Sequence, residues 1–321
     1  MQRPAAGGAR ETTADPTRRD GSVGARYSLP GGASCVTETY HLTLSCDNRP
    51  GIVAAVATSL FEAGADIIEA QQFDDLYAKR FFMRVAFQVD KPNGDVKALR
   101  ERLAPVTQRY QMQWRLRARG ERYRVLVLVS KYDHCLIDLL YRQRIGELQM
   151  EVAGIVSNHR REVLEISLPE VVPFHYLPLG KDNKPQQEQQ IKDVIEETRA
   201  DLIVLARYMQ ILSTDMCKFL AGRCINIHHS FLPGFKGAKP YSQAFDRGVK
   251  MIGATAHYVT EDLDEGPIVV QDTEPVSHTD SADALASKGR DIERRVLACA
   301  VRYHLEDRVL LNGNKTVVFR D

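Results

Sequence analysis

The segment Arg124-Val-Leu-Val-Leu-Val129 decides the fold of the larger part of this chain. It is a continuous run of β-branched and leucine residues, as expected for a strand that is buried on both faces of a sheet. Strand-like runs follow it at 151–157, 174–177, 201–206 and 223–227. Helical patterns lie between them at 135–144, 186–199 and 214–220. This alternation predicts an open, mostly parallel Rossmann-like α/β sheet, which binds ligands at the carboxyl ends of its strands.

A different pattern precedes this sheet. Strand-like and helical runs follow one another in the order βαββαβ, at 39–45, 52–63, 65–73, 80–89, 95–110 and 112–117. This order is typical of a ferredoxin-like α+β sandwich. Residues 1–37 have almost no large apolar side chains, so we predict that they are disordered. We therefore expect an extension at 1–37, a small domain at 38–118 and a larger domain at 119–321.

Composition excludes several classes of protein. The 321 residues include 43 Lys and Arg against 42 Asp and Glu, a net charge of +1 that argues against a nucleic-acid binder. The apolar runs are too short to cross a membrane, and no secretory signal is apparent. Six scattered cysteines without a CxxC pair indicate reduced thiols. We expect a cytoplasmic protein that binds neither membranes nor nucleic acid.

The most informative motif lies at the end of the strand-like run 223–227. Asn226 and His228 are two residues apart, so in a strand they project from the same face. A carboxamide and an imidazole side by side can both donate to one carbonyl oxygen. The alternative is that both side chains are simply hydrogen-bonded polar groups at a strand end.

A second segment, at 252–267, contains Asp264 close to Glu261, Asp262 and Glu265. Crowded carboxylates disfavour one another's ionised form, so one of them could stay close to neutral and serve in acid–base chemistry. The alternative is a solvated acidic turn. The side chains of His228, His229, His257 and Asp264 could also converge on zinc, but no metal-binding spacing supports this, and we expect no metal.

These two segments together resemble a known family. Asn226-x-His228-x-Ser230-x-Leu232-Pro233, followed by Asp264-x-Gly266-Pro267, resembles the signature of the 10-formyltetrahydrofolate-dependent formyltransferases. The resemblance implies that Asn226 polarises the formyl oxygen, His228 stabilises the oxyanion, and Asp264 orients water and manages protons. Residues 205–213 resemble the pteridine-binding loop of that family, which implies that substrate contacts the residues Met209, Gln210, Ile211 and Leu212.

The small domain resembles an ACT regulatory module. An ACT module joined to a formyltransferase-like domain resembles the formyltetrahydrofolate deformylase family. The resemblance implies an amino-acid effector, glycine or methionine, at a loop that contains Asp47, Asn48 and Gly51, and assembly into a homo-oligomer. The alternative is a dimerisation domain without a ligand.

The loop after the first strand of the larger domain separates transfer from hydrolysis. It has no glycine between Tyr123 and Gly146, so backbone amides cannot form a glycine-rich phosphate cradle there. Lys131 and His134 occupy the loop instead, as in the deformylases that it resembles; alternatively, Lys131 is a surface charge and His134 caps a helix.

We therefore predict hydrolysis of 10-formyltetrahydrofolate to formate and tetrahydrofolate, which would balance the one-carbon folate pools and supply formate for purine biosynthesis. No dinucleotide-binding glycine fingerprint follows any predicted strand, and we expect no cofactor, since the folate is the substrate. Two alternatives remain open: a formyltransferase with an unrecognised amine substrate, and a non-catalytic folate or amino-acid sensor.

Overall fold

The structure is a computed structural model that describes residues 37–90, 95–164, 171–180, 182–234 and 240–320. The predicted disorder of residues 1–37 lies outside these ranges, except at Thr37. There the first strand already begins, because Thr37 pairs with Asp90 in an antiparallel ladder.

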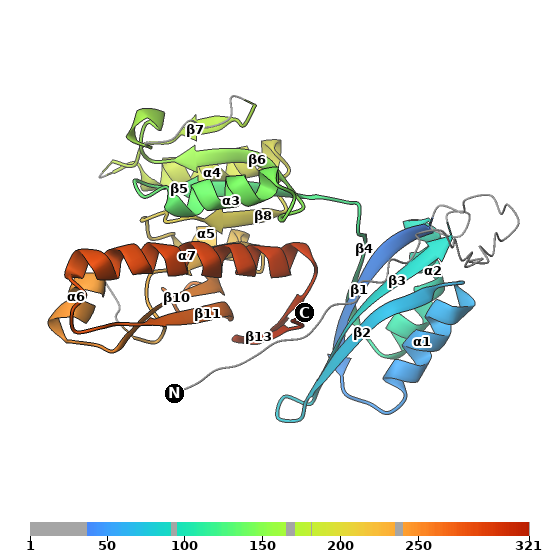
Figure 1. Cartoon of the computed structure of the whole chain (residues 1–321). Helices are drawn as coiled ribbons and strands as arrows, with labels where there is room; N and C mark the ends of the chain where they lie inside the picture. Colours follow the sequence, from blue (N-terminus) through green and yellow to red (C-terminus); the bar gives the residue numbers. More distant parts are fainter. Residues whose placement is uncertain (1–36, 91–94, 165–170, 181, 235–239, 321) are drawn as a thin grey trace, which may run out of the picture. The chain divides into compact units, whose positions relative to one another are not determined.

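The first part of the described chain is a four-stranded antiparallel sheet with two helices (Figure 1). Its elements are β1 (Thr37–Asp47), α1 (Ile52–Glu62), β2 (Asp66–Asp75), β3 (Arg80–Asp90), α2 (Val96–Arg109) and β4 (Gln113–Ala118). The strand order is β2-β3-β1-β4. Ile52, Val56 and Leu60 recur every four residues in α1 and are buried, so one apolar face of this helix packs on the sheet.

The second part is a seven-stranded sheet, and it confirms the predicted open, mostly parallel α/β fold. Its strands are β5 (Tyr123–Val129), β6 (Met150–Ser157), β7 (Phe174–Tyr176), β8 (Leu202–Leu205), β9 (Cys224–His228), β10 (Met251–Tyr258) and β11 (Ile268–Pro275). The order is β11-β10-β9-β8-β5-β6-β7. β10 pairs antiparallel with both of its neighbours, β9 and β11, and all other pairs are parallel. The chain first builds outward from β5 through β6 and then returns to β8, so the strand order reverses between β5 and β8.

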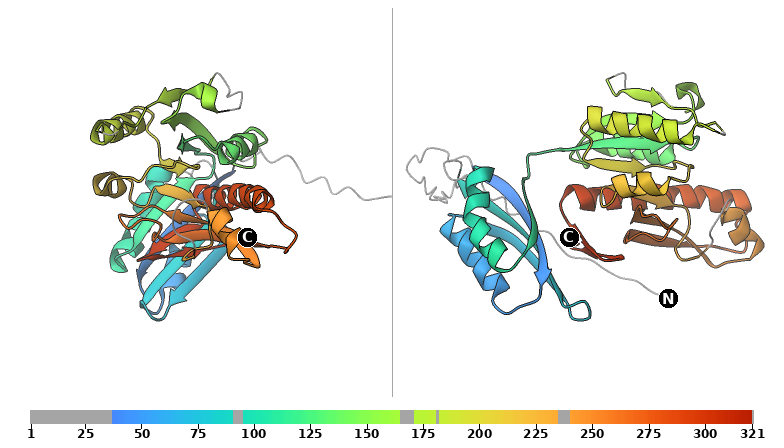
Figure 2. Two further views of the ribbon diagram at one scale, coloured as in Figure 1. Left: turned by 90° about the vertical axis from the view of Figure 1, so that its left-hand side faces the viewer. Right: turned by 180° about the vertical axis from the view of Figure 1, so that it is seen from behind.

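Helices cover both faces of this sheet (Figure 2). The main helices are α3 (His134–Arg144) and α7 (Ala282–Leu305) on one face, and α4 (Lys184–Glu197) and α5 (Thr214–Phe219) on the other. Val125 and Val127 of β5 belong to the core under α3 and α7, whereas Leu126 and Leu128 belong to the core under α4 and α5. This double burial explains the continuous apolar run of β5.

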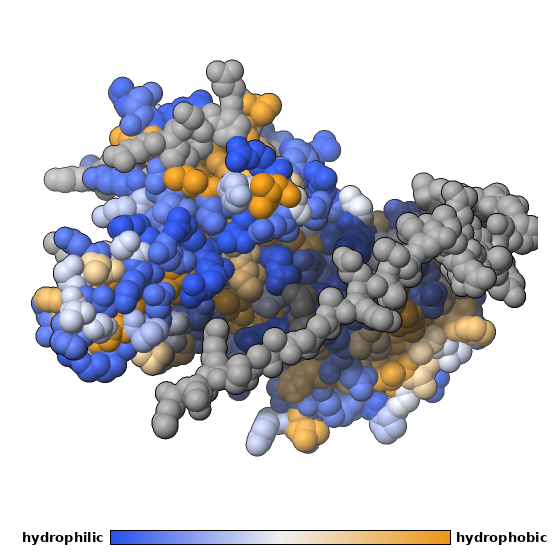
Figure 3. Space-filling model, in the orientation of Figure 1, coloured by the Kyte–Doolittle hydropathy of each residue, from blue (hydrophilic) through white to orange (hydrophobic). Residues whose placement is uncertain are grey.

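Shorter elements complete the fold. They are the 3-10 turn η2 (Arg161–Val163), helix α6 (Pro240–Asp246) and the hairpin of β12 (Val309–Asn312) and β13 (Lys315–Val318). Within the described ranges, no helix has the length and apolar character that a bilayer crossing requires. On the face drawn in Figure 3, hydrophilic residues predominate and apolar residues are scattered.

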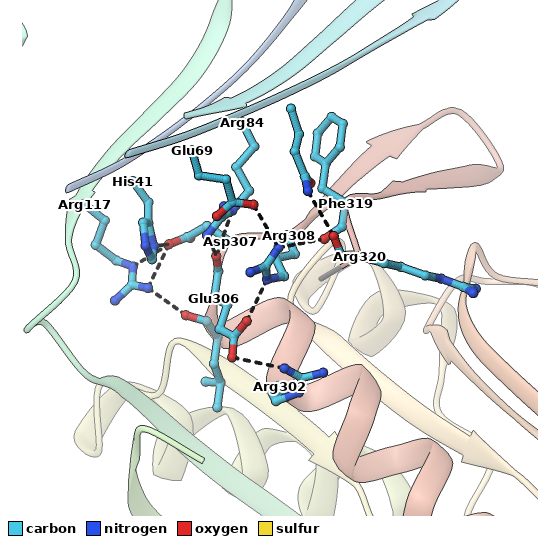
Figure 4. A network of polar contacts seen from close by, with 12 residues as sticks. His41, Glu69, Arg84, Arg117, Arg302, Glu306, Asp307, Arg308, Phe319 and Arg320 are labelled. Carbon is cyan, nitrogen blue, oxygen red and sulfur yellow. Dashed lines mark hydrogen bonds and ion pairs between the residues drawn. The ribbon is translucent and has the colours of Figure 1, made fainter. Parts of the chain in front are cut away.

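A buried ionic network joins the four-stranded sheet to the two residues that follow α7, Glu306 and Asp307 (Figure 4). The Asp307 carboxylate accepts hydrogen bonds from Arg117 Nη2 at 2.7 Å and Tyr123 OH at 2.7 Å, and it lies 3.4 Å from His41 Nδ1. Burial alone would raise the pKa of Asp307, but His41 and Arg117 outweigh this effect and hold the pKa well below its usual value. Nearby, Arg84 donates to the carbonyl oxygen of Glu306 at 3.1 Å. The folded state therefore depends on an ionised Asp307.

His304 in α7 gives the stability of the fold a specific pH dependence. Burial lowers the pKa of His304 to about 4, against an ordinary value of 6.5, and its Nδ1 accepts from Tyr258 OH at 2.6 Å. Between these two values the unfolded chain binds a proton that the folded chain does not. The free energy of unfolding should therefore fall as the pH drops from about 6.5 to about 4, by up to ~1.4 kcal/mol per pH unit.

Urea unfolding of the wild type and of His304→Phe at several pH values within this window checks this expectation. Phenylalanine retains the ring that packs on Tyr123 and Tyr258 but cannot titrate. We expect the variant to show a shallower dependence of stability on pH. Parallel curves for the two proteins would show that His304 does not carry the effect.

Candidate active site

Strand β9 presents Asn226 and His228 at its carboxyl end. Ile225 and Ile227 alternate with these two residues along the strand and belong to the core under α3 and α7. The antiparallel pairing of β9 with β10 sets His257 directly opposite Asn226, and the ladder between β10 and β11 shifts register at His257. Such irregularities re-aim side chains at functional sites. His257 thus reaches the same edge of the sheet as the two residues of β9.

The structure brings the three residues of the predicted catalytic trio together. His228 Nδ1 lies 3.2 Å from Asp264 Oδ1, and Asn226 Nδ2 lies 3.2 Å from His257 Nε2. His257 Nε2 is in turn 3.7 Å from the same Asp264 oxygen. His257, named above only as a possible zinc ligand, therefore connects the amide of Asn226 to the carboxylate.

The hydrogen-bond network assigns the protons of both imidazoles. His257 Nδ1 donates to the carbonyl oxygen of Tyr258 at 2.9 Å, so its Nε2 accepts from the Asn226 amide. Ser230 Oγ donates to the carbonyl oxygen of Gly234 at 2.8 Å and hence accepts from His228 Nε2 at 2.9 Å. Each ring nitrogen of His228 therefore has an oxygen partner, Ser230 Oγ at Nε2 and Asp264 Oδ1 at Nδ1.

Asp264 is ionised in this arrangement. Burial would raise its pKa, but its hydrogen bond with His228 acts against burial, and the pKa lies well below its usual value. The interpretation that neighbouring acids leave Asp264 close to neutral is therefore wrong. Its carboxylate faces two imidazoles, whereas Glu261 points to Lys218 at 3.7 Å.

The loop that carries Asp264 is held in an unusual backbone conformation. Asp264 has a φ of 59°, in the left-handed region that aspartate and asparagine tolerate better than most residues. Two residues later, a Cβ at Gly266 would lie 1.7 Å from the carbonyl oxygen of Tyr258. The amide of Tyr258 donates to the carbonyl oxygen of Pro267 at 2.9 Å, so the loop passes directly over the end of β10. Only glycine fits this approach.

These residues line a cavity of about 390 Å³. All four predicted pteridine contacts lie in its wall, namely Met209, Gln210, Ile211 and Leu212. The loop of Asp264 forms another part of the wall, with Val259 and Leu263. The prediction from sequence missed Arg207, which also lines the cavity and has a φ of 66°. Its position directly after strand β8, at the carboxyl edge, was the signal that could have identified it.

Lys131 and His134 do not lie in this wall among the described residues. Lys131 is exposed after β5. His134 begins α3, and its Nε2 lies 2.8 Å from Oε2 of the buried Glu293. The structure thus gives His134 a partner in α7 that neither the substrate-binding interpretation nor the helix-cap interpretation anticipated.

The described residues include one close group of side chains able to ligate a metal, formed by His134, Cys135 and Glu293. Glu293 already accepts a hydrogen bond from Tyr241 OH at 2.6 Å and pairs with His134. Burial raises the pKa of the Cys135 thiol well above its usual value. Both features disfavour metal binding by this group.

The predicted effector loop borders a separate cavity of about 440 Å³ in the four-stranded part. Asn48 and Gly51 line this cavity together with Gln72 and Asp74 of β2, whereas Asp47 ends β1 and does not belong to its described lining. Asn48 Nδ2 donates to Asp74 Oδ2 at 2.6 Å. Two of the three predicted effector residues, Asn48 and Gly51, therefore line the same cavity.

Comparisons with known proteins agree with this geometry. Residues 123–301 match the family model described as formyl transferase. The chain is 48% identical to the formyltetrahydrofolate deformylase of Corynebacterium sp. (strain P-1) over 281 residues. This match covers 87% of this chain and 97% of the relative. The crystal structure of formyltetrahydrofolate deformylase from Burkholderia mallei has 49% identity and a TM-score of 0.83, covering 88% of this chain and all of that one.

A more distant structure matches a smaller share of the chain. Glycinamide ribonucleotide transformylase 1 from Symbiobacterium toebii has 28% identity and a TM-score of 0.57, over 63% of this chain and 97% of that chain. The seven-stranded sheet and its site thus define a protein of the formyl transferase class. Within that class, the chain belongs to the formyltetrahydrofolate deformylase family.

Proposed function

We propose that this chain hydrolyses 10-formyltetrahydrofolate to formate and tetrahydrofolate. The observation that carries the proposal is that Asn226, His228 and Asp264 meet in one cavity, whose wall contains the 209–212 segment. Family membership supports the same reaction. In the cell, this reaction would balance the one-carbon folate pools and supply formate for purine biosynthesis.

We assign one role to each of these three side chains. The ionised Asp264 accepts a proton from a water molecule as the water oxygen attacks the formyl carbon. The oxyanion that forms is stabilised by the second amide hydrogen of Asn226 and by the imidazole of His228. Asp264 then delivers the proton to N10, the carbon–nitrogen bond breaks, and formate and tetrahydrofolate leave. The protein needs no cofactor in this scheme.

A formate-release assay with 10-formyltetrahydrofolate tests this proposal. We expect release of formate and tetrahydrofolate in equal amounts, at a rate that added glycinamide does not increase. A protein that binds the folate without turnover would be the sensor alternative. Turnover that requires an amine would make it a transferase.

Gly266→Ala should disable the site without touching a catalytic side chain. The methyl group would collide with the carbonyl oxygen of Tyr258, so the loop must shift and carry Asp264 away from His228. Because small displacements of catalytic groups are costly, we expect formate release to fall by about a hundredfold or more. Gly120→Ala is the matched control, since a Cβ there meets nothing within 4 Å, and it should retain full activity. Equal activity of the two variants would contradict the role given to this loop.

We further propose that an amino acid, glycine or methionine, binds the cavity beside Asn48. The N-terminus of α1 has no side-chain cap, so its backbone N–H groups and the helix dipole can hold a carboxylate. Asp74 Oδ1 is buried without a hydrogen-bond partner among the described residues, and a ligand ammonium group would satisfy it. β2 is an edge strand with Ile68 and Phe73 exposed, which supports assembly into a homo-oligomer as part of this proposal.

Asp74→Asn should weaken effector binding by about tenfold or more, because the amide no longer offers an anionic partner to the ammonium group. Titration calorimetry with glycine and with methionine measures this change. Asp47→Asn is the control, since Asp47 lies outside the described lining of the cavity and should leave the affinity unchanged. If neither ligand binds the wild type, the four-stranded part is a dimerisation domain without an effector.

A further inference from the structure

Two cavities lie on either side of one side chain, His229. The first is the active-site cavity. The second has a volume of about 460 Å³, and its wall includes Phe231, Tyr241 and Met251. His229 lines both cavities and is only 8% exposed. Its ring stacks on that of His228, with a centroid separation of 5.0 Å and an interplanar angle of 16°. The imidazole of His229 therefore forms part of the wall between the catalytic site and the second cavity.

Arg207 holds His229 in this position. A terminal nitrogen of the Arg207 guanidinium donates to His229 Nδ1, so His229 is neutral and carries its proton on Nε2. The Arg207 side chain is 10% exposed, and its Nε lies 3.4 Å from Glu293 Oε2.

Glu293 of α7 is in turn anchored by residues of two other helices. Its side chain is 1% exposed, its Oε1 accepts from Tyr241 OH of α6, and its Oε2 pairs with His134 of α3. Tyr241 packs so closely on α7 that a Cβ at Gly289 would lie 2.1 Å from its Cζ. Burial would raise the pKa of Glu293, but His134, Arg207 and Tyr241 lower it, so the carboxylate is ionised. Arg207 is thus held by a buried, fixed anion.

The wall restricts which nucleophile can reach the formyl carbon. An amine acceptor is larger than water and needs space for its substituent beside Asn226 and His228. The side chains of His229 and Arg207 occupy space in the same wall, next to these two residues. Water is small and needs no such space.

We propose that Arg207 and His229 form a partition that closes the formyl site to amine acceptors and leaves water as the acceptor. This inference rests on the proposed hydrolysis and names the residues that determine its specificity. If the partition is opened, the nitrogen of an unprotonated amine attacks the formyl carbon in place of water. The bond to N10 then breaks, N10 takes the proton that the amine loses, and the products are the N-formyl amine and tetrahydrofolate.

His229→Ala tests the partition, with glycinamide as the amine and 10-formyltetrahydrofolate as the donor. Formate and N-formylglycinamide are both quantified by mass spectrometry. We expect the ratio of N-formylglycinamide to formate to rise by about tenfold or more over the wild type, which corresponds to a change of ~1.4 kcal/mol in the relative barriers. Arg207→Ser removes the other half of the partition and should raise the ratio in the same direction.

Met251→Ala is the matched control, because it enlarges the second cavity without touching His229 or Arg207, and it should leave the ratio at the wild-type value. If both partition variants bind folate and form only formate at all glycinamide concentrations, the inference is overturned. Should His229→Ala fail to fold, Arg207→Ser decides the question alone. A wild type that releases no formate would instead overturn the proposed hydrolysis, so the two failures can be told apart.

Discussion

Asp264→Asn is expected to lower formate release by a factor of ~10³ or more, because it removes the group that accepts the proton of the attacking water. Asparagine has nearly the shape of aspartate and tolerates the left-handed backbone that residue 264 adopts, with its φ of 59°. The loop and the cavity should therefore keep their form, and the dissociation constant for the folate should change little. Stopped-flow or steady-state formate release, with folate binding measured on the same preparation, separates the two quantities.

Glu261→Gln provides the control for this variant. Glu261 lies in the same loop and borders the same cavity, but it is half-exposed and pairs with Lys218 across 3.7 Å. Such exposed pairs contribute little, so we expect its activity to stay within about threefold of the wild type. Substantial turnover by Asp264→Asn would show that this carboxylate is not the proton acceptor.

Asp307→Asn is expected to produce the largest loss of stability. The substitution leaves the buried Arg117 guanidinium without its anionic partner, and breaking a buried ion pair in this way typically costs ~3–5 kcal/mol. Asparagine also suits the left-handed φ of 54° at this residue, so backbone strain does not contribute. The single tryptophan, Trp114, lies in β4 three residues before Arg117, and its fluorescence during urea unfolding reports the effect directly.

The double variant Asp307→Asn with Arg117→Met separates charge from packing. Methionine retains apolar bulk over the Tyr123 ring, where the guanidinium carbon of Arg117 now lies 4.5 Å from the centroid, and it removes the unpaired charge. We expect the double variant to be more stable than Asp307→Asn alone. A double variant whose destabilisation is the sum of the two single losses would mean that no coupling exists between these residues.

Local patterns in the sequence predicted most of the elements that build the site. The apolar run 124–129 corresponds to β5, and the predicted helix at 186–199 corresponds to α4, which spans Lys184–Glu197. Strand periodicity also placed Asn226 and His228 on one face of β9, away from the core that holds Ile225 and Ile227. These features depend on residues close in sequence, which is why short-range patterns indicate them.

The features that escaped prediction depend on tertiary contacts. The ionised state of Asp264 follows from the direction of its side chain toward His228 and His257, and this direction is set by the close passage of Gly266 over Tyr258. His134 and Glu293 are 159 residues apart in sequence, so no local pattern relates them. Arg207 acquires its role only because α3, α6 and α7 bring His134, Tyr241 and Glu293 to the same place.

The most direct test of the central claim supplies purified protein with 10-formyltetrahydrofolate in buffer that contains no amine, and measures formate and tetrahydrofolate over time. We predict many turnovers per active site, with the two products formed in equal amounts and water as the only acceptor. Folate that stays formylated until an amine is added would contradict the proposed hydrolysis.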